Sequence, residues 1–84
     1  MKGRFEVPVR LFGRHREAAG EPVLPVELAD GATVADLKTA LAQHPAFGTS
    51  LDGAAVAVNR TYRSDESLVV EGDEVAIIPP VAGG

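Results

Sequence analysis

The chain has 84 residues, about half the usual length of a domain, so we expect one compact unit and exclude multi-domain architectures. Eight basic residues against twelve acidic residues leave a net charge of -4, which disfavours nucleic-acid partners because phosphate binding requires a concentrated basic surface. Cysteine is absent, which excludes disulfides, thiolate metal sites and thiol nucleophiles.

The first predicted elements are a strand and a short helix. Apolar and polar residues alternate over residues 5–11, a period of two that buries one face of a strand. Pro8 has no N–H to donate, so we expect either that the paired strand begins near it or that a bulge lies there. Gly13 and Gly20 bracket a stretch of good helix formers, which indicates one or two helical turns closed by a left-handed cap.

A second strand and the main helix are predicted next. The strand covers residues 23–28, and Pro25 on its outward face indicates a sheet edge that forms a hairpin with the first strand. Residues 33–36 match a helix-capping pattern with Asp in place of the usual Glu or Gln. An apolar stripe at helical spacing follows and stops at residues 44–45, so we expect one face of this helix to cover the sheet.

The C-terminal half predicts further strands. Residues 54–58 are short and compatible with a strand, and residues 59–62 indicate a turn. A second turn at residues 71–74 leads into the apolar run 75–78, which suits an interior strand buried on both faces. This order predicts an α+β fold in which one main helix packs on one face of a small mixed sheet, with the first and last strands paired at its centre. That arrangement is the ubiquitin-like β-grasp.

The sequence shows none of the common catalytic or metal-binding patterns. It contains no Gly-rich phosphate loop with Lys, no GxGxxG and no Ser in a GxSxG turn. His15 and His44 are the only imidazoles and lie far apart in the sequence, so we predict no metal site. No segment approaches the roughly 20 apolar residues that span a bilayer, and we expect a cytoplasmic protein without a membrane partner.

The C-terminal segment is the most distinctive part of the sequence. The pair Pro79-Pro80 has no N–H and prefers extended dihedrals, so it stops the last strand and directs the chain away from the sheet. The tail beyond it, residues 81–84, reaches about 13 to 14 Å when extended, enough to enter the cleft of another protein. Gly83 and Gly84 are narrow, which leaves the Gly84 carboxylate as the presented group. We therefore predict a β-grasp domain over residues 1–80 and a flexible tail.

Three stretches, residues 9–20, 33–37 and 72–84, resemble the small subunits of molybdopterin synthase, a family of β-grasp sulfur carriers. The terminal motif is shared with the thiamine sulfur carriers. The first stretch, a strand running into Phe-Gly and a short helix rich in Arg and Glu, looks like the molybdopterin branch. The chain departs from the family at Ile77 and Ile78, where aromatic residues are common.

The resemblance implies that the chain carries sulfur. An E1-like partner would adenylate the Gly84 carboxyl with ATP and magnesium, and a desulfurase or rhodanese-type donor would then replace AMP to leave a Gly84 thiocarboxylate. The tail residues Val81, Ala82 and Gly83 would enter the active site of the large synthase subunit, where sulfur passes to cyclic pyranopterin monophosphate in molybdenum cofactor biosynthesis. No cofactor would be bound permanently, and the catalytic residues would belong to the large subunit.

Two questions stay open at the level of sequence. The chain could instead be a thiamine-type sulfur carrier, or a ubiquitin-like modifier whose Gly84 forms isopeptide bonds. Repeated docking also requires an accessible and moderately apolar surface around the tail. Phe12 and Tyr62 are candidates for that surface, but the sequence is equally compatible with burial of each side chain in the core.

Overall fold

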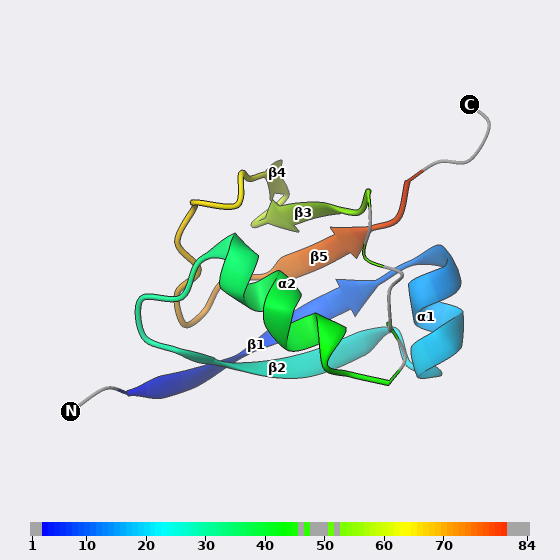
Figure 1. Ribbon diagram of the computed structural model, residues 1–84, viewed down its shortest axis with the longest axis horizontal. Coiled ribbons are helices and arrows are strands. Elements are labelled where there is room, and N and C mark those ends of the chain that lie inside the picture. The colour runs from blue at the N-terminus through cyan, green and yellow to red at the C-terminus, as the bar shows by residue number, and fades with distance from the viewer. Residues whose placement is uncertain (1–2, 46, 48–50, 52, 81–84) are drawn as a thin grey trace.

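The computed structural model describes residues 3–45, 47, 51 and 53–80. Its elements are β1 (Arg4–Leu11), α1 (Gly13–Ala19), β2 (Val23–Ala29), α2 (Val34–Ala42), β3 (Ala55–Val58), β4 (Thr61–Tyr62) and β5 (Val75–Ile78). The strands form one five-stranded sheet in the order β2-β1-β5-β3-β4, with β1 and β5 parallel and the other neighbours antiparallel. α2 lies across one face of this sheet, and α1 lies beside the end to which β5 points (Figure 1). The predicted β-grasp, with its first and last strands paired at the centre, is confirmed.

The antiparallel pair β1–β2 runs without interruption through its two prolines. Pro8 stands opposite Pro25, and the Leu11 N–H donates to the Pro22 carbonyl at 2.9 Å. Hydrogen-bonded and non-bonded pairs alternate in such a ladder, so the two prolines occupy a pair that needs no N–H between the strands. The bulge offered for Pro8 is therefore absent. Only the parallel pairing with β5 starts after it, at Val9, and β2 is the edge strand that Pro25 predicted.

The end of α1 and the start of α2 lie where the sequence predicts them. α1 closes on Gly20, which has a φ of 75° and donates its N–H to the Arg16 carbonyl at 2.9 Å. α2 begins with a capping box in which Thr33 Oγ1 accepts the Asp36 N–H at 3.3 Å and Asp36 Oδ2 accepts the Thr33 N–H at 2.9 Å. The predicted Asp variant of this motif is thus confirmed. The buried side chains of α2 are Val34, Leu37 and Leu41.

Replacing Thr33 by Ala is expected to lower the free energy of unfolding by about 0.5 to 2 kcal/mol, because the Asp36 N–H loses its acceptor. Thr39→Ala is the matched control. Thr39 Oγ1 only donates to the Ala35 carbonyl within the same helix, at 3.1 Å, so its loss should change stability by no more than about 0.5 kcal/mol. Urea unfolding of both variants makes the comparison, and equal losses would contradict the capping role.

β5 is the predicted interior strand, but only one of its faces is fully buried. Val75 and Ile77 have no exposed surface, whereas Ala76 and Ile78 on the opposite face are half-buried. The prediction of burial on both faces is wrong because no helix in the described parts of the chain covers the second face. The core lies on the α2 side, where the completely buried side chains include Val7, Val9, Leu11, Leu37, Leu41, Val69 and Ile77.

The β3–β4 hairpin corrects another prediction. Thr61–Tyr62 form strand β4 rather than part of a turn, and they pair with the end of β3. The turn is confined to Asn59 and Arg60, which have φ of 53° and 69°, values typical of a two-residue hairpin turn. The Asn59 side chain donates to Asp73 Oδ1 and accepts the Glu74 N–H, both at 2.9 Å. This clamp fixes the hairpin to the segment before β5.

Candidate functional site

The chain leaves the sheet at the end of β5 between two glycines. We call Ile78, Pro79 and Pro80 the tail root. Pro79 lies against Gly13 at the start of α1, where an added Cβ would stand 3.4 Å from Pro79 Cγ. Pro80 lies against Gly53 before β3, where an added Cβ would stand 3.5 Å from Pro80 Cγ. The tail root therefore passes between the start of α1 and the segment that leads into β3.

The direction of the tail root follows from the packing of β5. Ile77 pairs with Leu11 of β1 on one side and with Val56 of β3 on the other, and all three side chains are buried. A strand that is paired on both sides and packed into the core gives the residues after it a fixed direction. β5 ends at Ile78, so the predicted stop at the proline pair is confirmed.

The residues predicted to carry the chemistry are Val81, Ala82, Gly83 and Gly84, and all four lie outside the described residues. Their roles stay predictions, as does the domain boundary at residue 80. The described part of the chain fixes where they attach. Their attachment point is Pro80, an exposed residue at the end of the molecule that also holds α1.

An apolar surface extends from the tail root over the sheet face that α2 leaves uncovered. We call it the open-face patch, and its residues are Ala55, Ala57, Tyr62, Ala76 and Ile78. Pairing across the sheet places Ile78 beside Ala55 and places Tyr62 in one row with the two other alanines. Phe12 is 40% exposed and Tyr62 is 69% exposed. The sequence left open whether Phe12 and Tyr62 lie in the core or on the surface, and the structure places both outside the core.

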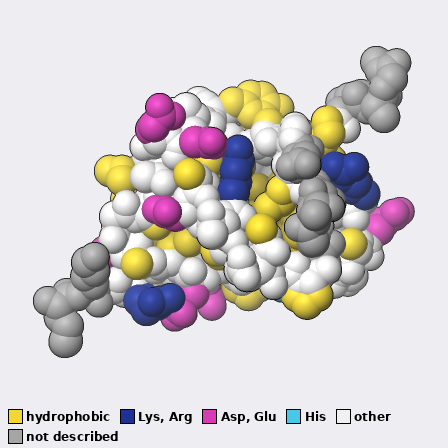
Figure 2. Space-filling model, viewed as in Figure 1, with side chains coloured by type: hydrophobic (Ala, Val, Ile, Leu, Met, Phe, Trp, Pro, Cys, Tyr) yellow, Lys and Arg dark blue, Asp and Glu magenta, His cyan; other side chains and the backbone are white. Residues whose placement is uncertain are grey.

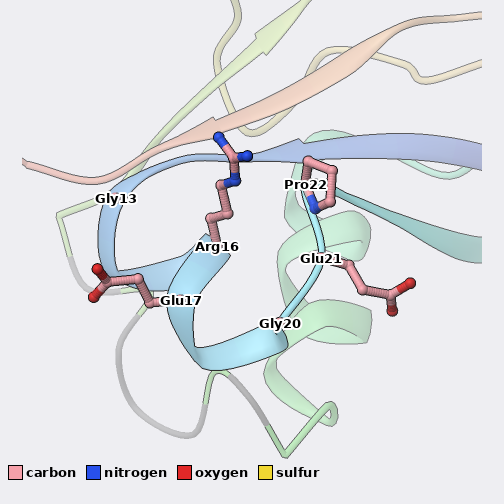
Figure 3. A pocket seen from close by; sticks show the side chains of 6 residues that line it. All are labelled: Gly13, Arg16, Glu17, Gly20, Glu21 and Pro22. Carbon is pink, nitrogen blue, oxygen red and sulfur yellow. The ribbon is translucent and has the colours of Figure 1, made fainter.

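A shallow hollow of about 490 Å³ lies beside Gly13, between α1 and the segment that joins it to β2 (Figure 3). The Arg16 side chain points from α1 toward the strands, while Glu17 and Glu21 point outward in different directions. These groups do not converge on a point where a reacting atom could sit. The hollow therefore lacks the arrangement that acid-base or nucleophilic catalysis requires.

The two histidines meet at one aromatic ring, although they are far apart in the sequence. The ring centroid of Phe47 lies 5.1 Å from that of His15 and 6.0 Å from that of His44. His15 and Phe47 are both buried, so this contact belongs to the core beneath α1. Among the described residues, no group of three or more His, Asp or Glu side chains could hold a metal ion. Neither helix in this part of the chain is long and apolar enough to cross a membrane.

Comparison with known proteins identifies the family. A model described as the ThiS family matches residues 9–84. The chain belongs to the ThiS family. One relative of this ThiS-family chain is the molybdopterin synthase sulfur carrier subunit of Chlamydomonas reinhardtii, which is 39% identical over 83 residues that cover 95% of this chain and 100% of the relative. The resemblance found in the sequence is thus confirmed.

Solved structures share the fold of this ThiS-family chain. Small archaeal modifier protein 1 (SAMP1) of Haloferax volcanii has a TM-score of 0.82 and 31% identity, covering 94% of this chain and 99% of that one. A chain from the complex of subunits 1 and 2 of the molybdopterin-converting factor from Helicobacter pylori has a TM-score of 0.68 and 23% identity, covering 95% of this chain and 100% of that one. The second likeness shows the fold alone.

Sequence reasoning missed the two supports of the tail root in this ThiS-family chain. The sequence indicates Gly13 only as a boundary of the short helix, and it predicts no element for the segment that contains Gly53. Both have positive φ, 53° and 78°, and both meet a proline of the tail root. The order of residues carries no signal for these contacts, because they join segments that only the folded sheet brings together.

Proposed function

We propose that this chain is the sulfur carrier subunit of a molybdopterin synthase and that it carries sulfur as a thiocarboxylate on Gly84. The observation that carries the proposal is the likeness, at 39% identity over 95% of the chain, to a relative of that name. The tail root supports it, because β5 holds this segment, to which the tail is attached, against Gly13 and Gly53.

The proposed cycle starts from the chemistry of a carboxylate. A free carboxylate resists nucleophiles because it is negatively charged, so an E1-like partner joins it to AMP, consuming ATP with magnesium and releasing pyrophosphate. The outer sulfur of a persulfide on a desulfurase or rhodanese-type donor then attacks the carbonyl carbon, AMP leaves with the electron pair of the broken C–O bond, and an acyl disulfide joins Gly84 to the donor. A further thiol attacks the donor sulfur of this disulfide, so that the donor leaves in a disulfide with that thiol and the electron pair of the broken S–S bond goes to the sulfur on Gly84. The Gly84 thiocarboxylate that remains is the sulfur donor to cyclic pyranopterin monophosphate. We propose that this cycle runs in the cytoplasm, where ATP is available.

The remaining chemistry belongs to the large synthase subunit in this proposal. The described residues of this chain form no converging set of catalytic groups around the tail root. The large subunit would therefore supply the acids, the bases and the pterin pocket, while Val81, Ala82 and Gly83 thread its active site. The open-face patch adjoins the tail root, and it is the surface that we propose to dock on the large subunit and on the adenylating enzyme.

Intact mass spectrometry tests the proposal. After incubation with the adenylating enzyme, ATP, magnesium and a sulfur donor, the chain is expected to gain the mass difference between one sulfur and one oxygen. Omitting ATP should abolish the gain. The charged chain should then lose its sulfur when the large subunit and the pterin are added. A chain that gains no mass in the complete mixture would contradict the proposal.

The docking role of the open-face patch gives a separate prediction. Tyr62→Ser is expected to raise the dissociation constant for the large subunit about tenfold or more, because it removes the exposed aromatic side chain that lies in one row with Ala57 and Ala76 of the open-face patch. Leu68→Ser is the matched control, since Leu68 is 61% exposed but lies at the α2 start, where it pairs with Thr33. Isothermal calorimetry measures both affinities. Equal losses of affinity in Tyr62→Ser and Leu68→Ser would contradict docking through the open-face patch.

A protein modifier is the second candidate function, and the likeness to small archaeal modifier protein 1 favours it. A modifier would transfer activated Gly84 to amines of other proteins instead of to sulfur. Cell extract supplied with the adenylating enzyme and ATP separates the two functions. Lysine adducts on many proteins would support the modifier, whereas a thiocarboxylate without adducts supports the carrier.

A further inference from the structure

Gly13 and Pro79 lie side by side where β1 and β5 leave the sheet. The two strands are parallel, and Leu11 pairs with Ile77 at the end of their ladder. Gly13 and Pro79 each follow two residues later, so the parallel register brings them together. A Cβ added to Gly13 would stand 3.4 Å from Pro79 Cγ, which is already van der Waals contact. In Figure 2, hydrophobic side chains, in yellow, lie at this end of the molecule.

The backbone at Gly13 is held on both sides. On one side, Leu11 is buried at the end of β1. On the other side, His15 is buried with its ring centroid 5.1 Å from that of Phe47, a contact that fixes α1 against the core. Gly13 makes the turn between these two anchors with a φ of 53°. A side chain larger than a methyl group at Gly13 would therefore displace Pro79 rather than the turn.

Pro79 is the partner of this contact that can shift. β5 ends at Ile78, and Pro79 has no N–H with which to continue the ladder. Its side chain is half-buried, and the next residue, Pro80, is exposed. A shift of the Pro79 ring therefore changes the direction in which the tail root leaves the sheet.

We propose that Gly13 is a positioning residue for the reaction at Gly84, because the lack of a side chain at Gly13 lets the Pro79 ring set the direction of the tail root. The proposal rests on the proposed function, in which the Gly84 carboxyl must reach the adenylating centre of a partner. Misplacing a reacting group by about 1 Å can lower a rate about a hundredfold. A glycine supplies no reacting side chain, so Gly13 acts through Pro79.

Gly13→Val is expected to lower kcat/KM for sulfur charging about tenfold or more, because its branched side chain displaces the Pro79 ring. Gly20→Val is the matched control. Gly20 closes the same helix with a φ of 75°, so valine is strained there as well, but among the described residues nothing lies within 4 Å of an added Cβ. The Gly20 variant should charge like the natural chain. The rate is the gain of sulfur mass with time in the complete charging mixture.

Three further variants separate positioning from a defect of folding. Asn adopts positive φ with little strain, so Gly13→Asn should fold like the natural chain and still lose charging rate, whereas Gly20→Asn should keep it. Gly13→Ala stops at contact distance from Pro79 Cγ and should keep the natural rate. Circular dichroism checks that each variant is folded at the temperature of the assay.

Dependence on the Pro79 ring is the most specific part of the test. Pro79→Ala removes the ring carbon that a side chain at Gly13 would meet. In a chain that already carries Pro79→Ala, Gly13→Val should lower the rate no further, because the two substitutions act through one contact. A defect of folding would instead add to the effect of Pro79→Ala. Additive losses would therefore overturn the proposal.

The outcomes also separate this proposal from the proposed function. Unchanged charging by Gly13→Val, or equal losses in Gly13→Val and Gly20→Val, in a mixture that charges the natural chain would overturn the positioning role alone. The ¹³C resonances of the Pro79 ring give a readout that needs no charging, and they should shift in Gly13→Asn but not in Gly20→Asn. Unshifted resonances in both variants would likewise overturn the positioning role. A natural chain that gains no sulfur would overturn the proposed function.

Discussion

A chain without Gly84 is expected to accept no sulfur, and a chain with a tryptophan added after Gly84 should behave in the same way. In the first variant the carboxyl belongs to Gly83 and stops one residue short of the activating site. In the second variant a bulky side chain stands at the end that must pass through a narrow cleft. Intact mass spectrometry after the complete charging reaction measures both, and we expect the loss to be complete.

The matched control is a tryptophan added before Met1. β1 starts at Arg4 on the side opposite to the tail root, so this variant should charge like the natural chain. Binding to the large subunit gives a second readout, since removal of one residue leaves the open-face patch in place. If the tryptophan after Gly84 left charging intact, the terminal carboxyl would not be the working group.

Ile77→Ala is expected to lower the free energy of unfolding by about 2 to 5 kcal/mol. Ile77 is fully buried at the centre of the sheet, between Leu11 and Val56, so its truncation leaves a cavity under α2. Small domains have only about 5 to 15 kcal/mol of stability, and each kcal/mol lowers Tm by about 4 to 8 °C at this size. Thermal unfolding followed by circular dichroism measures the change.

Val70→Ala is the control for this prediction, because Val70 is 55% exposed and its truncation should cost no more than about 0.5 kcal/mol. The Ile77 variant should also charge with sulfur only while it is folded, since β5 sets the position of the tail root. A loss below about 1 kcal/mol for Ile77→Ala would contradict the central position of β5 in the core.

Much of the fold could be predicted because local patterns and the sheet agree. The alternation over residues 5–11 and 23–28 matches the buried faces of β1 and β2, and the Thr33–Asp36 cap starts α2 where expected. The alternation of apolar and polar residues follows burial, so the buried face of a long strand can be predicted from the sequence. The pairing of the first and last strands also followed, because both carried the most apolar faces.

The errors lie where the structure depends on contacts between distant segments. Tyr62 joins a strand because Asn59 and Arg60 form a tight turn before it, and the Asn59 side chain fixes that turn to Asp73, a contact that no local pattern predicts. The β1–β2 ladder is unbroken at Pro8 because Pro8 and Pro25 face each other in a pair that needs no N–H between the strands. For the site, composition and order pointed to the tail, whereas the bracing of Pro79 by Gly13 became visible only in three dimensions.

The most direct test of the account locates the sulfur within the charged chain. The C-terminal peptide of the charged protein is fragmented in a mass spectrometer, and the mass of each fragment shows which residue carries the added sulfur. We predict that every fragment containing Gly84 carries it and that fragments ending at Gly83 or earlier do not. Sulfur on any other residue, or none in this peptide while the protein as a whole is charged, would contradict the account.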